Sequence, residues 1–163
     1  MKAISVWQPW ASAIAQEGKH IETRSWRTNY RGPIAIHASR RRVLSEIRHY
    51  ASRWNFCGAL GVRMWEVDLE SWLPFGEIIA VAELVECRPT ESFTASEIDQ
   101  VYFRGWDRES QYTWTERDLG DFSPGRFGWV FEDGIRLLDK PIPFRGAQGL
   151  FTLPENVSRM LEA

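Results

Sequence analysis

Residues 18–26 read GKHIETRSW and lie between a predicted helix and a predicted strand. In an extended chain over 21–26, the side chains of Glu22, Arg24 and Trp26 project from one face about 7 Å apart. Lys19, at the preceding turn, can lean over them. The group can position a phosphate or hydrogen-bond a base, and a desolvated Lys19 can act as a base or nucleophile. The alternative is an exposed ion pair on a strand, which stabilises by at most about 1 kcal/mol.

This stretch belongs to a basic segment of an otherwise acidic chain. Residues 19–53 hold nine of the twenty lysines and arginines and only two acids, a balance of +7, which leaves −9 for the rest and −2 in total. Aromatic residues such as Trp26, Tyr30 and Tyr50 are interleaved with these cations. Cations between flat rings suit a surface that binds phosphates and stacks bases. A solvated basic face paired with acids elsewhere would have the same composition.

Hydrophobic patterns on both sides of this stretch predict many short strands and few helices. Strands are expected at 3–6, 21–26, 33–38, 77–87, 128–131, 135–142 and 150–153. The pair around Asp133 and Gly134 is typical of two strands joined by a turn. Helices are expected from Pro9 to a left-handed Gly18 cap, over 43–54, over 94–101, and from Pro154 to Leu161. We therefore predict one α+β domain over 1–163, a mixed β-barrel of about six strands flanked by short helices.

Two segments, 55–75 and 102–127, are expected to be long loops or insertions. The second is polar but carries aromatic residues, among them Tyr102, Trp106, Tyr112 and Trp114. A loop of this length in a compact domain is typical of a lid or binding element. The rings either close over an unstacked base or pack a small second core.

The composition gives no sign of a membrane span, a metal or a cofactor. No run approaches the roughly 18 apolar residues that a bilayer requires. Two cysteines, Cys57 and Cys87, are too few for a disulfide framework or a four-ligand zinc site, and the three histidines share no metal-ligand spacing. We expect a cytoplasmic protein without metal or cofactor, and the sequence leaves its oligomeric state open.

Three runs in the first 38 residues give the sequence a specific likeness. They are Gln8-Pro9-Trp10-Ala11-Ser12, then Lys19-x-x-Glu22-x-Arg24-Ser25-Trp26, then Tyr30-Arg31-Gly32-Pro33 leading to Ile36-His37-Ala38. Together they resemble the activating signal cointegrator homology (ASCH) domain, which has a Gly-x-Lys-x-x-Glu-x-Arg pattern. The run GRFGW at 125–129 and the glycines at 146 and 149 are similar to bacterial members. The resemblance implies a barrel related to the pseudouridine synthase and archaeosine transglycosylase (PUA) domains, which bind RNA.

The resemblance also implies a function and an alternative to it. The function is nucleic-acid binding, RNA above all and single-stranded nucleic acid including DNA more generally, in a cleft of Lys19, Glu22 and Arg24. Trp26 and Arg31 would then be a wall and a phosphate contact. The alternative is a hydrolase that acts on RNA or on a modified nucleoside such as acetylated cytidine. There Lys19 would activate water or substrate, and Glu22 or Glu83 would transfer protons.

Other residues extend the candidate surface, each with an ordinary structural alternative. Trp10 opens the first helix and suits either the cleft wall or the core. The run Arg40-Arg41-Arg42 can grip a phosphate backbone without reading sequence, or be a solvated surface. Arg126, between two glycines, can present its guanidinium at the cleft mouth. Nine tryptophans also leave a protein-interaction module open as a third class of function.

Overall fold

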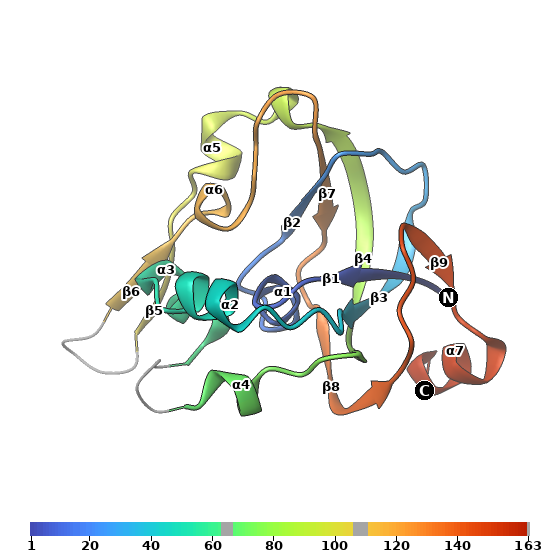
Figure 1. Ribbon diagram of the computed structural model, residues 1–163. Coiled ribbons are helices and arrows are strands. Elements are labelled where there is room, and N and C mark those ends of the chain that lie inside the picture. The colour runs from blue at the N-terminus through green and yellow to red at the C-terminus, as the bar shows by residue number, and fades with distance from the viewer. Residues whose placement is uncertain (63–66, 106–110, 163) are drawn as a thin grey trace.

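The computed structural model describes residues 1–62, 67–105 and 111–162, and a mixed sheet forms their centre (Figure 1). The strands are β1 (Lys2–Val6), β2 (Ile21–Arg24), β3 (Gly32–Ala38), β4 (Glu77–Pro89), β5 (Tyr102–Gly105), β6 (Gln111–Trp114), β7 (Phe127–Phe131), β8 (Arg136–Pro143) and β9 (Leu150–Thr152). The helices are α1 (Trp10–Ala15), α2 (Leu44–Ala51), α3 (Trp54–Leu60), α4 (Leu69–Trp72), α5 (Ala95–Ile98), α6 (Glu116–Leu119) and α7 (Glu155–Glu162), with a 3-10 turn, η1, at Thr90–Ser92. The predicted α+β class is confirmed.

The long strand β4 organises the sheet. β3 lies antiparallel along one of its edges, and β8 and β7 follow one another along the other edge. β1 is parallel to β3, β9 is antiparallel to β1, and β2 is antiparallel to β7. The order β2-β7-β4-β3-β1-β9, with β8 also on β4, makes seven strands where about six were expected. Among the described residues these strands form an open path rather than a closed ring, because β2 and β9 end it.

The turn expected at Asp133 and Gly134 does not fold β7 back on β8. Both strands are antiparallel to β4, so they run in the same direction as two segments of one sheet edge. Gly134 has a φ of 86°, which a backbone step between the two segments requires. An Asp-Gly pair provides a positive φ both in a hairpin turn and in a break within one sheet edge. The local sequence pattern therefore could not distinguish a hairpin from such a break.

Side-chain alternation on β1 and β3 builds a core on each face of the sheet. Ile4 and Ile34 pack with residues of α1 on one face. Their neighbours Ala3 and Ala35 pack on the other face with residues of α7, among them Leu161. Helices therefore cover both faces of the sheet. No helix in the described part of the chain is long and apolar enough to cross a membrane.

The end of α1 differs from the predicted glycine cap. The left-handed residue is Glu17, with a φ of 55°, and the Gly18 N–H donates to the Ala13 carbonyl over 2.8 Å. Gly18 is required for a different reason. A β-carbon at this position would lie 2.1 Å from the carbonyl oxygen of Ala59 in α3. The turn that leads to Lys19 is thus packed directly on a helix backbone.

The two segments expected as loops contain regular structure. Residues 55–75 include most of α3 and all of α4, and 102–127 include the β5–β6 hairpin and α6. Trp114 is buried with Phe56 in a second core, and Tyr102 stacks on Trp114 with ring centroids 5.9 Å apart. For these rings the second-core alternative is confirmed. Trp106 lies outside the described residues.

Candidate functional site

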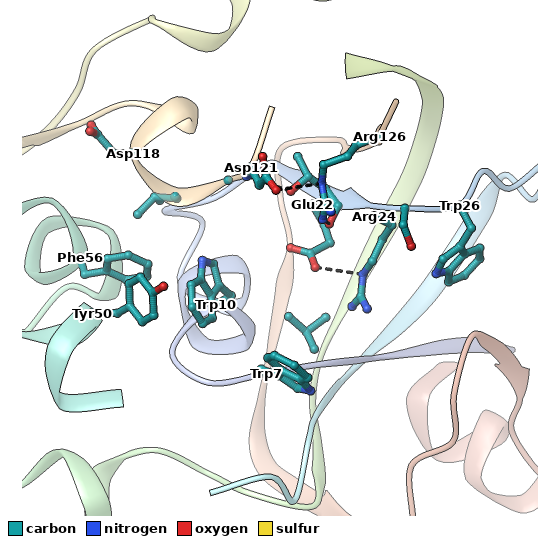
Figure 2. A pocket seen from close by; sticks show the side chains of 15 residues that line it. Trp7, Trp10, Glu22, Arg24, Trp26, Tyr50, Phe56, Asp118, Asp121 and Arg126 are labelled. Carbon is teal, nitrogen blue, oxygen red and sulfur yellow. Dashed lines mark hydrogen bonds and ion pairs between the residues drawn. The ribbon is translucent and has the colours of Figure 1, made fainter. Parts of the chain in front are cut away.

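A cavity of about 460 Å³ opens between β2, α1, α3 and the segment after α6 (Figure 2). Its walls are largely aromatic. Trp10 packs on Tyr50 and on Phe56, with ring centroids 4.6 and 5.6 Å away, and forms one side. Trp26 lies across the cavity from Trp10, and Trp7, which is 51% exposed, lies below Trp10 (Figure 2). Aromatic walls of this kind suit a flat ligand.

The polar groups of this cavity include two neighbours on β2. The Glu22 Oε1 atom lies 3.0 Å from Arg24 Nε, and a terminal nitrogen of Arg24 donates to the Ser5 carbonyl over 2.7 Å. Both side chains face the cavity, as the alternation of a strand predicts. Trp26, beyond the end of β2, lines the same cavity and packs edge-on against the buried Trp129 at 4.6 Å. A carboxylate and a guanidinium therefore present acceptors and donors side by side.

Lys19 lies behind this pair. Its side chain is fully buried, and its ammonium donates to the Ile21 carbonyl and lies 3.8 Å from Glu22 Oε2. Lys19 is not among the residues that line the cavity, while Gly120, which passes over its ammonium, is. A β-carbon on Gly120 would lie 3.4 Å from Lys19 Nζ. The lysine thus supports Glu22 from the protein side.

The segment around α6 holds the turn at Lys19 in place. Glu116 is 1% exposed, and its carboxylate accepts hydrogen bonds from the backbone N–H groups of His20, over 2.6 Å, and Ile21, over 3.2 Å. The Trp114 indole donates to the Gly18 carbonyl over 2.6 Å. These contacts join residues 18–21 to a segment more than ninety positions later.

Asp121 and Arg126 form the upper rim of the cavity (Figure 2). The Asp121 N–H donates to the Thr23 hydroxyl over 3.1 Å, and Arg126 donates to the Thr23 carbonyl over 3.2 Å. Arg126 Nε lies 3.4 Å from Asp121 Oδ2. Hydrogen bonds from the hydroxyl and the backbone of Ser123, and the charge of Arg126, hold the pKa of Asp121 below its usual value. Asp121 therefore presents a charged carboxylate at the rim.

A second cavity, of about 690 Å³, shares Trp7, Arg24 and Trp26 with the first. Arg40 and Arg145 also line it, and the described residues of its wall include no carboxylate. The two cavities are neighbours with Arg24 on their common wall, and they differ in charge.

His37 lies under the second cavity and is neutral. Its Nε2 donates to the Phe144 carbonyl over 3.0 Å, so its Nδ1 accepts from the Ser5 hydroxyl, also over 3.0 Å. Burial lowers the pKa of His37. The hydrogen bond to the Phe144 carbonyl raises this pKa, and the charge of Arg40 lowers it. The histidine is thus a structural link between β1, β3 and the chain after β8.

Most predicted site residues meet at the two cavities. Glu22, Arg24, Trp26, Trp10 and Arg126 line the first, and Arg40 lines the second. Arg41 is paired with Glu46, yet its guanidinium lies 3.9 Å from the ring centre of Trp7. It therefore flanks the entrance.

Three predicted residues lie elsewhere. Arg42 covers the ring of Phe75 at 4.4 Å, and Arg31 donates to the carbonyls of Thr28 and Tyr30. Glu83 on β4 lies near Gly32, where a β-carbon would be 3.9 Å from its Oε1 atom. None of the three lines either of the two cavities.

Sequence reasoning missed several wall residues: Trp7, Tyr50 and Phe56 in the first cavity, with Asp118 and Asp121, and Arg145 in the second. Trp7 and Trp10 on either side of Pro9, and Tyr50 in the basic segment, were usable signals. The other residues carry no local pattern. Within the described ranges no cluster of three His, Cys, Asp or Glu residues could hold a metal ion.

Comparison with known proteins identifies the family. The ASCH domain family model matches residues 4–130, so this chain belongs to the ASCH family. The crystal structure of ASCH from Zymomonas mobilis aligns with a TM-score of 0.55 at 16% identity, covering 99% of this chain and 92% of that chain. The likeness shows a shared fold, and the predicted PUA-like α+β class is confirmed. No curated protein matches the sequence.

Proposed function

We propose that this protein binds single-stranded nucleic acid, RNA in preference to DNA, and holds one unstacked base in the first cavity. The observation that carries the proposal is a carboxylate–guanidinium pair, Glu22 and Arg24, between aromatic walls. Bases stack on aromatic side chains, at about 1–3 kcal/mol each, and single-stranded bases are read through the donors and acceptors on their edges. The association of the ASCH family with RNA binding supports the preference for RNA.

The size and charge of the first cavity favour a base over a phosphate. About 460 Å³ is within the usual range of small-ligand sites and accommodates one base. Its guanidiniums lie next to carboxylates, Arg24 beside Glu22 and Arg126 beside Asp121. The described residues of this wall therefore include no unpaired cation to attract a phosphate, and their donors and acceptors suit the edge of a base.

A hydrolase acting on a modified nucleoside such as acetylated cytidine, or on RNA, is the second candidate. It is favoured by one observation, the 3.8 Å separation of Lys19 Nζ from Glu22 Oε2 just behind the wall. That chemistry requires Lys19 to reach water or substrate, whereas its ammonium is buried and donates to the Ile21 carbonyl. Asp121, not Glu83, is the other carboxylate near Glu22 at the cavity. Binding is the function that this geometry favours.

The test of binding is fluorescence anisotropy of a labelled single-stranded RNA, and of the same sequence as DNA, at two salt concentrations. We expect binding that weakens as salt rises, because phosphate contacts release counterions. Trp10→Ala should weaken it, and Phe103→Ala, an exposed ring on β5, should not. Absence of binding to both nucleic acids would overturn the proposal and favour a protein-interaction module.

The second candidate is tested by incubating the protein with acetylated cytidine and with short RNA, and by chromatography of the products. Turnover that disappears in Glu22→Gln would establish a hydrolase. Turnover that is equal in wild type and Lys19→Ala would exclude a catalytic role for the lysine. The cytoplasmic location expected from the sequence stays a prediction.

A further inference from the structure

We infer that the second cavity is a phosphate site, so that the ligand is a nucleotide of a strand rather than a free nucleoside. The inference rests on the proposed function, because it concerns the group attached to the base in the first cavity. It assigns to Arg145, Arg40 and Arg24 the role of phosphate contacts.

The division of charge between the two cavities is the first argument. In the first cavity the guanidiniums of Arg24 and Arg126 lie beside the carboxylates of Glu22 and Asp121, whereas the second cavity is lined by three arginines and by no described carboxylate. Neither Arg40 nor Arg145 is in an ion pair with a described residue. Arg41, next to Arg40, is by contrast neutralised by Glu46. Guanidinium groups without a carboxylate partner are suited to bidentate contact with phosphate.

The common wall is the second argument. Trp7, Arg24 and Trp26 line both cavities, so a ligand in one is in contact with the side chains that bound the other. Arg24 has one nitrogen 3.0 Å from Glu22 and another donating to the Ser5 carbonyl, which fixes its guanidinium between the two spaces. A base in the first cavity would place its sugar at this wall and its phosphate beyond it.

The packing of the chain around Arg145 is the third argument. A β-carbon at Gly146 would lie 2.4 Å from His37 Cε1 and 2.5 Å from the Ser5 hydroxyl, so only glycine lets the backbone approach this closely. On the other side of Arg145, the Phe144 carbonyl accepts the hydrogen bond from His37. The backbone on both sides of Arg145 is therefore held against β1 and β3.

Among the described residues of this wall, the three arginines are the only charged side chains, because His37 is neutral. Because burial lowers its pKa, His37 is neutral at physiological pH and neither adds to nor opposes their field. Arg145 follows the residues that the family model matches, 4–130. The phosphate site therefore combines Arg24 of the family motif with a part of this chain beyond it.

The test compares a nucleoside with its 5′- and 3′-monophosphates by quenching of tryptophan fluorescence. In wild type we expect one monophosphate to bind about tenfold more tightly than the nucleoside, because hydrogen bonds to charged groups contribute most of such a difference. Arg145→Ala and Arg40→Ala should each remove most of this advantage and leave nucleoside affinity within about twofold. Arg159→Ala, which removes an exposed guanidinium on α7, is the matched control and should behave as wild type.

A second measurement uses a dinucleotide and its uncharged methylphosphonate analogue, which keeps both bases. Equal affinity of the two in wild type would overturn the phosphate site and leave base binding intact. A phosphate advantage that persists in both arginine variants would also overturn it, because the phosphate would then be bound elsewhere. If no nucleoside, nucleotide or oligonucleotide binds at all, the proposed function itself fails.

Discussion

Lys19 Nζ lies 3.8 Å from Glu22 Oε2, yet the lysine is fully buried and only the glutamate faces the cavity. Arg24 holds the other carboxylate oxygen at 3.0 Å. The two cations therefore fix Glu22 in place from behind and from the side. The family motif builds a positioned acceptor, and the consequences of this arrangement can be measured.

Replacing the carboxylate should change which base is preferred. Glu22→Gln keeps the size of the side chain but exchanges one acceptor for a donor. Carboxylates accept from the amino group of cytosine, which uracil lacks. We expect the affinity for oligo-cytidine to fall about tenfold and that for oligo-uridine to fall less, measured by anisotropy. Glu155→Gln on α7 is the control, and equal losses for both oligonucleotides would contradict a reading role for Glu22.

Substitutions of Trp7 and Trp129 should have different effects, the first on oligonucleotide binding and the second on folding stability. Trp7 is 51% exposed, so Trp7→Ala should weaken oligonucleotide binding by about 1–3 kcal/mol, the stacking contribution, with little change in unfolding. Trp129 has no exposed surface, and Trp129→Ala should cost about 3–5 kcal/mol of stability. Urea denaturation and anisotropy measure the two quantities. Unchanged binding in Trp7→Ala would remove this ring from the site.

Gly18 should tolerate no side chain. Gly18→Ala places a β-carbon 2.1 Å from the Ala59 carbonyl oxygen, so α1 or α3 must move, and the loss should exceed the about 1–3 kcal/mol typical of overpacking. Gly134 has a φ of 86° but open space around it, so Gly134→Ala should cost only about 1–2 kcal/mol. Chemical denaturation gives both values. A smaller loss for Gly18→Ala than for Gly134→Ala would show that the close approach is not constraining.

His37 should make stability depend on pH. Burial, and secondarily the charge of Arg40, lowers its pKa below the ordinary 6.5. Below that pH the unfolded state binds a proton that the folded state does not. The free energy of unfolding should therefore fall as pH falls from about 6.5 through the lowered pKa.

The pH effect of His37 can be isolated with two variants. His37→Gln should flatten the slope just below pH 6.5, and His49→Gln, an exposed residue of α2, should keep it. The pKa of Glu97 is lowered to about 2 from its usual 4.5. Its effect falls in a separate pH range, between 4.5 and 2, where stability is lost as this carboxylate is protonated. A slope that is unchanged in His37→Gln would contradict the assignment.

The sequence predicted those parts of the site that depend on local spacing. The common face of Glu22 and Arg24 follows from the two-residue period of a strand, and the motif runs led to the family. The burial of Lys19 could not be predicted, because Gly120 covers it from a position a hundred residues later. Likewise, Phe56 and Arg145 reach the cavities through tertiary packing of separate elements, which leaves no periodic pattern in the chain.

The two hydrogen bonds that Glu116 accepts from His20 and Ile21 make α6 part of the foundation of the motif. A designer who replaced α6 with the corresponding segment of another ASCH protein, in order to alter ligand choice, would also remove the support beneath Lys19. Such chimeras should therefore retain Glu116 and its spacing from Trp114.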